Sequence, residues 1–307
     1  IELTSNEAGI VFRKDKTFLL DWMQVYMEAQ ESAGKKDGSQ IKIAMRILKD
    51  YAGEMVTLDQ IDGDFCRGYI TYLLTEYHPK GKDISNYTLH NYYRALNGAL
   101  NSAVRKKKMK ANPFNELEKS EKIRKPESMR SYMTIEEVQA LIDTPMPHEE
   151  YEIVKCAYLF SCFCGLRISD IIKLKWNDVF VDRGQYRLAV SMKKTKEPIY
   201  LPLSPEALKW MPERGGKSSE DNVFDLPSAN TIRMQLKPWA KAAGISKRFS
   251  YHTSRHTFAT MMLTLGADLY TVSKLLGHAD VKMTQVYAKI INKKKDEAVN
   301  LVNGLFH

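Results

Sequence analysis

The sequence predicts a mainly α-helical protein with a small antiparallel β-sheet, divided into two domains. Apolar residues recur at helical spacing along most of the 307 residues, whereas apolar and polar residues alternate only within 179–202. Between 111 and 131, two prolines and many charged residues interrupt the periodicity, as in a segment that joins two domains. A chain of this length can bury two separate hydrophobic cores.

The first domain is predicted to be a helical bundle that comprises residues 1–112. Four stretches carry apolar residues at the spacing of an amphipathic helix. They are 11–31, 39–51, 63–77 and 85–107. A basic linker over 113–131 follows, and the second domain is expected to span 132–307.

The second domain is predicted to open with a helix that has a capping box, in which Thr134 is the N-cap and Glu137 the third helical residue. The next helix, 151–164, is apolar on nearly all sides, so we expect it to be central. Gly165 ends this helix, and Arg167 then lies at the start of the next helical segment.

The alternating region 179–202 is predicted to form the sheet, with a tight turn at Asp182-Arg183-Gly184 and a lysine-rich turn at 193–196. Helices are expected again at 204–210 and 228–243. The region from Tyr251 onward is predicted to form three short helices joined by glycine-containing turns.

The charge of the chain predicts a polyanionic partner. Lys and Arg number 46 against 37 Asp and Glu, which gives a net charge of +9 and favours nucleic acid over an anionic membrane. No apolar run approaches the roughly 20 residues of a membrane span, and no secretory segment opens the chain. We therefore expect a cytoplasmic, nucleoid-associated protein whose four cysteines are reduced.

A group of basic and polar residues is predicted to bind DNA, because such side chains contact phosphates and base edges. A basic helix end that only complements the helix dipole is the alternative. The predicted residues lie in the fourth helix, directly after it and in the linker. They are Thr88, Asn91, Tyr92, Arg94, Arg105, Lys106, Lys107, Lys108, Lys110, Arg124 and Lys125.

The second domain contains the residue types that phosphoryl transfer without a metal requires. Cations must stabilise the non-bridging oxygens, a nucleophile must attack, and a proton donor must reach the leaving oxygen. Arginines at helix starts, three histidines and Tyr287 suit these roles, although each alone is more often structural. Because the carboxylates of this domain are scattered, we expect no metal and no other cofactor, and a metal-dependent nuclease is disfavoured.

Five motifs resemble the tyrosine recombinases of the phage and mobile-element integrase family. They are GLRISD (165–170), KKTKEPIYLPL (193–203), HTSRHTFAT (252–260), LGHAD (276–280) and TQVYAKI (284–290). The resemblance covers the region from about Thr134 to the C-terminus and implies a tyrosine-recombinase catalytic domain. The bundle fits the core-binding domain of the family more loosely.

The resemblance implies the role of each site residue. Tyr287 is the nucleophile and Lys194 the proton donor, with Lys193 and Lys196 as alternatives in the same lysine-rich turn. The charge on the phosphate is stabilised by Arg167, His252, Arg255 and His278. Asp170 and His256 are supporting residues.

The resemblance also implies a reaction and its partners. Tyr287 would form a 3′-phosphotyrosine on an attachment site in double-stranded DNA, and strand exchange would pass through a Holliday junction. The synaptic complex would be a homotetramer that exchanges the tail 292–307, and docking of the tail on its own domain is the alternative. Accessory DNA-bending proteins would be further partners. A type IB topoisomerase and a non-catalytic DNA-binding protein are the alternatives. Many integrases of mobile elements also carry an N-terminal arm-binding domain, and because the sequence begins at Ile1, such a domain would have been removed or would lie upstream.

Overall fold

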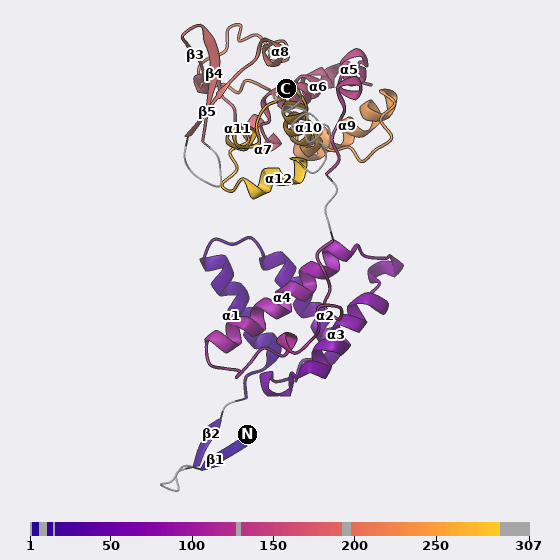
Figure 1. Cartoon of the computed structure of the whole chain (residues 1–307), viewed down its shortest axis with the longest axis vertical. Coiled ribbons are helices and arrows are strands. Elements are labelled where there is room, and N and C mark those ends of the chain that lie inside the picture. Colours follow the sequence, from indigo (N-terminus) through magenta and orange to yellow (C-terminus); the bar gives the residue numbers. More distant parts are fainter. Residues whose placement is uncertain (1, 6–10, 15, 127–129, 192–197, 289–307) are drawn as a thin grey trace, which may run out of the picture. The chain divides into compact units, whose positions relative to one another are not determined.

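A computed structural model describes residues 2–5, 11–14, 16–126, 130–191 and 198–288 (Figure 1). The chain divides into two compact units, Ile1–Ser128 and Met129–His307. Helices dominate both units, and the larger sheet has three antiparallel strands in the order β3-β4-β5. The predicted fold class is therefore confirmed.

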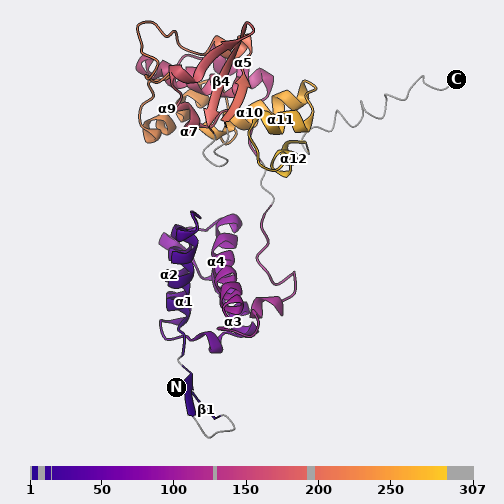
Figure 2. The same ribbon diagram turned by 90° about the vertical axis from the view of Figure 1, so that its left-hand side faces the viewer.

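The first unit contains a β-hairpin and a bundle of four helices. Its elements are β1 (Glu2–Ser5), β2 (Val11–Lys14), α1 (Leu19–Ser32), α2 (Gly38–Ala52), α3 (Gly63–Thr75) and α4 (Asn86–Arg105). Two short 3-10 helices lie in the connections between these helices, and a third follows α4. They are Leu58–Gln60, Pro79–Gly81 and Pro113–Asn115. The helix α4 packs against α1 and α2, as both views of the bundle show (Figures 1 and 2).

The prediction of one helix over 11–31 is wrong at its beginning. Val11–Lys14 pairs with β1, and the helix begins only at Leu19. The backbone N–H of Leu19 donates to the carbonyl of Val56, and that of Leu58 donates to the carbonyl of Thr17. These bonds hold the residues before Leu19 in an extended conformation, which a periodicity argument does not detect.

The core of the first unit extends into the range predicted as linker. Phe114, Leu117 and Ile123 are buried among the apolar side chains of the four helices. Asn112 supports this turn, since its side chain caps the backbone of Phe114 and donates to Asn97 and Asn101. Residues 113–123 therefore belong to the bundle, and its apolar contacts outweigh the high local charge.

The second unit is built around α6 (Glu152–Cys164). The other helices among its described residues are α5 (Ile135–Asp143), α7 (Ile168–Ile171), α8 (Pro205–Leu208), α9 (Ala229–Ala242), α10 (Tyr251–Thr264), α11 (Leu269–Leu275) and α12 (Lys282–Ala288), with 3-10 helices at Glu149–Tyr151 and Trp176–Asp178. The strands are β3 (Val179–Asp182), β4 (Gln185–Ser191) and β5 (Pro198–Pro202).

The central position predicted for the apolar helix is confirmed. In α6, Tyr158 and Phe160 are fully buried, and the ring of Tyr158 contacts Trp239, Phe249 and Tyr251. The helix α10 packs directly against α6. The predicted capping box of Thr134 and Glu137 is also present at the start of α5. Thus α6 forms the support on which the residues of α10 are held.

The last three described helices follow one another as predicted, and Figure 2 shows them in orange to yellow. Gly266 and Gly277, both with positive φ, form the turns between them. Among the described residues, no helix combines the length and the apolar character that a membrane span requires. The four cysteines are free, and three of them are buried.

Candidate active site

The helix α10 contributes three of the predicted site residues. His252, Arg255 and His256 are spaced so that they share one face of the helix. Ser250 and Thr253 cap its first turn through their hydroxyl groups and backbone. Arg255 and His256 are buried, with 2% and 6% of their surfaces exposed, whereas His252 is exposed.

Arg255 joins three parts of the second unit. Its Nη1 donates to the carbonyl of Gly165 at 2.8 Å, and its Nη2 donates to the carbonyl of Leu276 at 2.5 Å. Gly165 ends α6 with φ of 75°, a conformation that only glycine adopts without strain. Burial, followed by the charge of Arg167, lowers the pKa of Arg255 to about 10, so the guanidinium remains charged at neutral pH.

Arg167 lies where predicted, as the N-cap of α7. Its backbone N–H donates to the Asp170 carboxylate at 3.4 Å, and its Nη1 lies 4.0 Å from the same oxygen. Asp170 is buried, while the side chain of Arg167 is 28% exposed. Asp170 therefore orients an arginine whose end is open to solvent.

Tyr287, the predicted nucleophile, lies against the face of α10. Its hydroxyl is 2.6 Å from Nδ1 of His256, and the residue is only 3% exposed. The ring of His252 meets that of His256 edge-on, with centroids 4.5 Å apart. His256 thus contacts the tyrosine directly, which is a closer position than its predicted supporting role required.

His278 comes from the turn after α11. Its Nδ1 lies 2.8 Å from the hydroxyl of Thr284 in α12, a partner that the sequence motifs did not indicate. The pairing fixes the ring orientation and leaves Nε2 for another contact. Since Thr284 is fully buried, this orientation is set by the core of the unit.

Burial and positive charge keep the histidines neutral. Burial first, and then nearby cations, lower the pKa of His256 to about 3 and that of His278 to about 4. The same causes lower the pKa of His252. Burial raises the pKa of Tyr287, against the charges of Arg255, Arg130 and Arg167. With its proton on Nε2, neutral His256 accepts a hydrogen bond from the Tyr287 hydroxyl.

The structure therefore brings together Arg167, His252, Arg255, His256, His278 and Tyr287 from four segments of the chain. Cations, neutral imidazoles and a hydroxyl in one cluster suit the binding of a phosphodiester and attack upon it. Lys194, Lys193 and Lys196 lie outside the described residues, as does the tail 292–307. Among the described residues, no group of three or more His, Cys, Asp or Glu side chains is arranged to hold a metal ion.

Comparison with known proteins decides the family. The Phage integrase family matches residues 131–294. The chain belongs to this family. The Phage integrase SAM-like domain matches residues 18–124, which are the residues of the bundle and the turn that packs on it.

Relatives of this phage integrase family protein carry the name tyrosine recombinase. One from Pseudothermotoga lettingae is 29% identical over 71% of this chain and 82% of its own. The tyrosine recombinase XerD of Vibrio vulnificus is 32% identical, over 55% of this chain and 59% of its own, so the chain spans less than two thirds of that relative. The family predicted from the motifs is confirmed.

Solved structures show the same fold. The Tn1549 transposon integrase, in complex with transposon right end DNA, superposes with a TM-score of 0.69 at 17% identity, over 94% of this chain and 99% of that one. A lambda integrase tetramer bound to a Holliday junction gives 0.67 at 21% identity, over 89% and 78%. At these identities the likeness establishes the fold.

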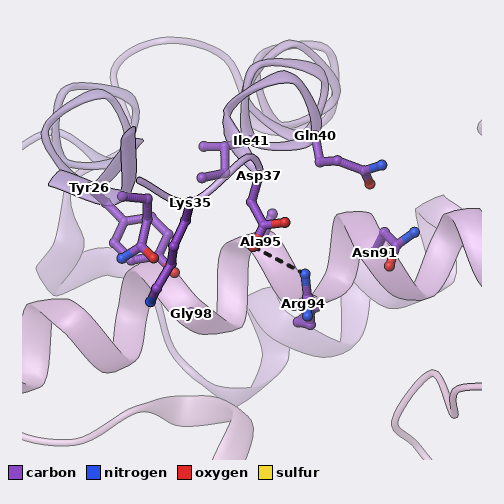
Figure 3. A pocket seen from close by; sticks show the side chains of 10 residues that line it. Tyr26, Lys35, Asp37, Gln40, Ile41, Asn91, Arg94, Ala95 and Gly98 are labelled. Atoms are coloured by element: carbon purple, nitrogen blue, oxygen red, sulfur yellow. Dashed lines mark hydrogen bonds and ion pairs between the residues drawn. The ribbon is translucent and has the colours of Figure 1, made fainter. Parts of the chain in front are cut away.

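In this family member, the bundle residues predicted to bind DNA differ in their surroundings. Asn91 and Arg94 line a polar pocket of about 220 Å³, shown in Figure 3. Lys35, Gln40 and Asp37 line it from the other side, and Arg94 forms an ion pair with Asp37 at 3.3 Å. Polar groups from two elements thus converge there.

Tyr92 lies in the core of the bundle and does not line this pocket. It is 8% exposed, and its ring packs edge-on against Tyr77 within the core of the bundle. The ring of Tyr92 thus stabilises the bundle, and contact of Tyr92 with DNA stays a prediction. Thr88 pairs with Ser85 as part of the N-terminal cap of α4. The remaining predicted residues are exposed, and they are Arg105, Lys106, Lys107, Lys108, Lys110, Arg124 and Lys125.

Proposed function

We propose that this protein catalyses site-specific DNA recombination, as in the integration and excision of a mobile element. The observation that carries the proposal is the contact of the Tyr287 hydroxyl with His256 on the helix face that holds Arg255. A buried hydroxyl that touches a neutral imidazole, next to charged guanidinium groups, is the arrangement of an activated nucleophile. The names of the relatives support the same reaction.

In the proposed cleavage step, the Tyr287 oxygen attacks the scissile phosphorus. A phosphorus–oxygen bond forms to Tyr287, and the bond to the 5′ oxygen of the next nucleotide breaks. Arg167, Arg255, His252 and His278 stabilise the non-bridging oxygens. The phenolic proton passes toward His256, and Lys194 supplies a proton to the leaving 5′ oxygen. The reverse reaction with a partner strand completes exchange, so no external energy source is required.

The proposed partners are double-stranded DNA at attachment sites, further copies of this chain and accessory DNA-bending proteins. The lambda integrase structure named above is a tetramer bound to a Holliday junction, and we propose the same assembly here. The tail 292–307 would then exchange between protomers. A protein of this function would work in the cytoplasm, on the nucleoid.

The proposal is tested with a DNA duplex that contains an attachment site and a nick next to the scissile phosphate. Loss of the short fragment beyond the nick should trap a covalent adduct with wild-type protein, but not with Tyr287→Phe. Tyr270→Phe is the matched control, since Tyr270 is an exposed tyrosine of α11. An adduct that persists in Tyr287→Phe contradicts the assignment of Tyr287 as the nucleophile. If wild-type protein forms no adduct, the proposed enzymatic activity is contradicted.

A second measurement separates recombination from a type IB topoisomerase. Recombination requires two attachment sites and should give exchanged products, whereas a topoisomerase relaxes supercoiled plasmid without any site. Relaxation of a plasmid that lacks the site, without exchange, would favour the topoisomerase.

A further inference from the structure

A strap formed by Ser131, Tyr132 and Met133 crosses the beginning of α10. The hydroxyl of Ser131 donates to the carbonyl of Arg248 at 2.6 Å, and Lys247 donates to the carbonyl of Tyr132 at 2.9 Å. The N–H of Met133 donates to the hydroxyl of Thr257 at 2.9 Å. The strap is thus fixed on both sides of the segment that carries His252, Arg255 and His256.

Several further contacts make this strap rigid. Met133 is 2% exposed. Lys247 lies over the ring of Tyr132, with 5.5 Å from Nζ to the centroid, and forms an ion pair of 2.6 Å with Glu137. Thr257, which receives the bond from Met133, itself donates to the carbonyl of Thr253. A segment held by backbone and side-chain bonds in this way has a defined path.

Arg130 directly precedes the strap, about 3.8 Å from Ser131 between Cα atoms. Its side chain is exposed, and no carboxylate of the described residues forms an ion pair with it. Arg248, whose carbonyl anchors Ser131, lies only four positions before His252 along the chain. Arg130, which forms no ion pair with a carboxylate of the described residues, therefore begins a segment that is fixed beside the first turns of α10.

The electrostatics of the cluster agree with this position. Burial is the largest cause of the lowered pKa values of His252, His256 and His278, and the charge of Arg130 lowers all three further. Burial raises the pKa of Tyr287, and the charges of Arg255, Arg130 and Arg167 oppose the rise. Asp170 faces the arginines in the same cluster. The field of Arg130 therefore reaches the nucleophile and the imidazoles together.

We propose that Arg130 is a third arginine of the phosphate-binding site, which contacts a non-bridging oxygen of the phosphodiester attacked by Tyr287. This inference rests on the proposed function. A guanidinium that no carboxylate of the described part of the chain pairs, and whose charge acts on the histidines and on Tyr287, has the charge and the donor groups for a phosphate oxygen. Arg167 and Arg255 lie within sequence motifs. Arg130 lies before the first helix of the second unit, outside these motifs.

The experiment measures the rate of covalent adduct formation on the nicked duplex for wild type, Arg130→Ala and Arg233→Ala. Arg233 is the matched control because it is an exposed arginine of the same unit that pairs with Asn230 on α9. We expect Arg130→Ala to be slower by about 100-fold, as for the loss of one preorganised donor. Arg130→Lys should restore part of the rate, and Arg233→Ala should equal wild type.

A neutral phosphate separates a contact from an indirect effect. With a methylphosphonate at the scissile position there is no negative charge to stabilise, so the defect of Arg130→Ala should shrink to a few-fold. The inference is overturned if the defect of Arg130→Ala is equally large on both substrates. It is also overturned if a methylphosphonate at a neighbouring position cancels the defect. If Arg130→Ala forms the adduct as fast as Arg233→Ala, the inference is also overturned, but the proposed function stands. Absence of any adduct with wild type instead removes the proposed function itself.

Discussion

At the scale of single residues, the state of His256 governs what Tyr287 can do. A hydroxyl can pass its proton only to a neutral imidazole. Burial with the surrounding charges lowers the pKa of His256 to about 3, which keeps the imidazole neutral and also makes it a weaker base than a free histidine. His256→Gln keeps a hydrogen-bonding side chain but removes the basic nitrogen. We expect adduct formation to slow by about 100-fold, within the range for general base catalysis, while DNA affinity measured by mobility shift stays unchanged. An equal loss of affinity would contradict this role.

The same pKa values predict how stability depends on pH. In the unfolded chain a histidine has a pKa near 6.5, whereas folded His256 and His278 have values of about 3 and about 4. The unfolded state therefore binds more protons below about pH 6.5. The stability that their neutral forms contribute is fully present above that pH and is lost as the pH falls, down to about 4 for His278 and about 3 for His256. Each such histidine adds up to about 1.4 kcal/mol per pH unit to the slope.

Urea unfolding of wild type and His256→Gln at pH 7.5, 6 and 5 measures this dependence. The free energy of unfolding of wild type should fall steeply below about pH 6.5. The variant should show a shallower slope, because it takes up about one proton fewer on unfolding. His148→Gln is a suitable control because His148 is an exposed histidine of the same unit that precedes a short 3-10 helix. Parallel curves for wild type and His256→Gln would contradict the assigned pKa shift.

The sequence motifs indicate the residue types of the site but not the partners of these residues. The carbonyl groups of Gly165 and Leu276 that hold Arg255 belong to the backbone and carry no sequence signal. The hydroxyl of Thr284 that orients His278 comes from a different helix. The burial of Tyr92 could not be predicted either, because an aromatic residue on an amphipathic helix can face the core or the surface, and only packing decides between them.

At the scale of elements, the end of α6 determines where Arg255 lies. A Cβ on Gly165 would meet Cδ1 of Phe258 at 2.5 Å and Cδ2 of Leu276 at 3.1 Å, in addition to the strain of positive φ. We expect Gly165→Ala to destabilise the protein by about 3 kcal/mol and to displace the carbonyl that binds Arg255. Adduct formation should fall with it.

Gly184→Ala is the control for backbone strain alone. Gly184 also has positive φ, in the turn between β3 and β4, but a Cβ there would meet nothing within 4 Å. It should cost about 1 kcal/mol and leave adduct formation unchanged. Chemical unfolding of the two variants gives the difference, which measures the packing around Gly165. Equal costs would contradict the importance of that packing.

Elements with strong local signals were predicted well, and those set by distant contacts were not. The capping box of Thr134 and the glycine after α6 mark helix ends within a few residues of sequence, so α5 and α6 match the prediction. The start of α1 depends instead on backbone bonds from Thr17 and Leu19 to a segment near Val56. Local periodicity does not contain that information.

At the scale of the whole molecule, each unit has its own hydrophobic core. The first is formed around Met23, Ile47 and Leu96, and the second around Tyr158 and Trp239. Units of this size with separate cores are expected to fold alone. We predict that fragments 1–128 and 129–307 each unfold cooperatively in urea, monitored by circular dichroism. A fragment without a cooperative transition would show that its core depends on the other unit.

The two units are expected to act together on DNA. Exposed cations occur in both, for example Lys106 and Arg105 in the first and Arg130 in the second. If both units contact one attachment site, joining them makes the second contact intramolecular, and affinity rises by about 100-fold or more without any new contact. We therefore expect the full chain to bind an attachment site at least that much more tightly than either fragment in mobility-shift assays at one salt concentration. An equimolar mixture of the fragments is the control, because it holds the same surfaces without the covalent connection. A full chain that binds no more tightly than its better fragment would mean that only one unit contacts the site.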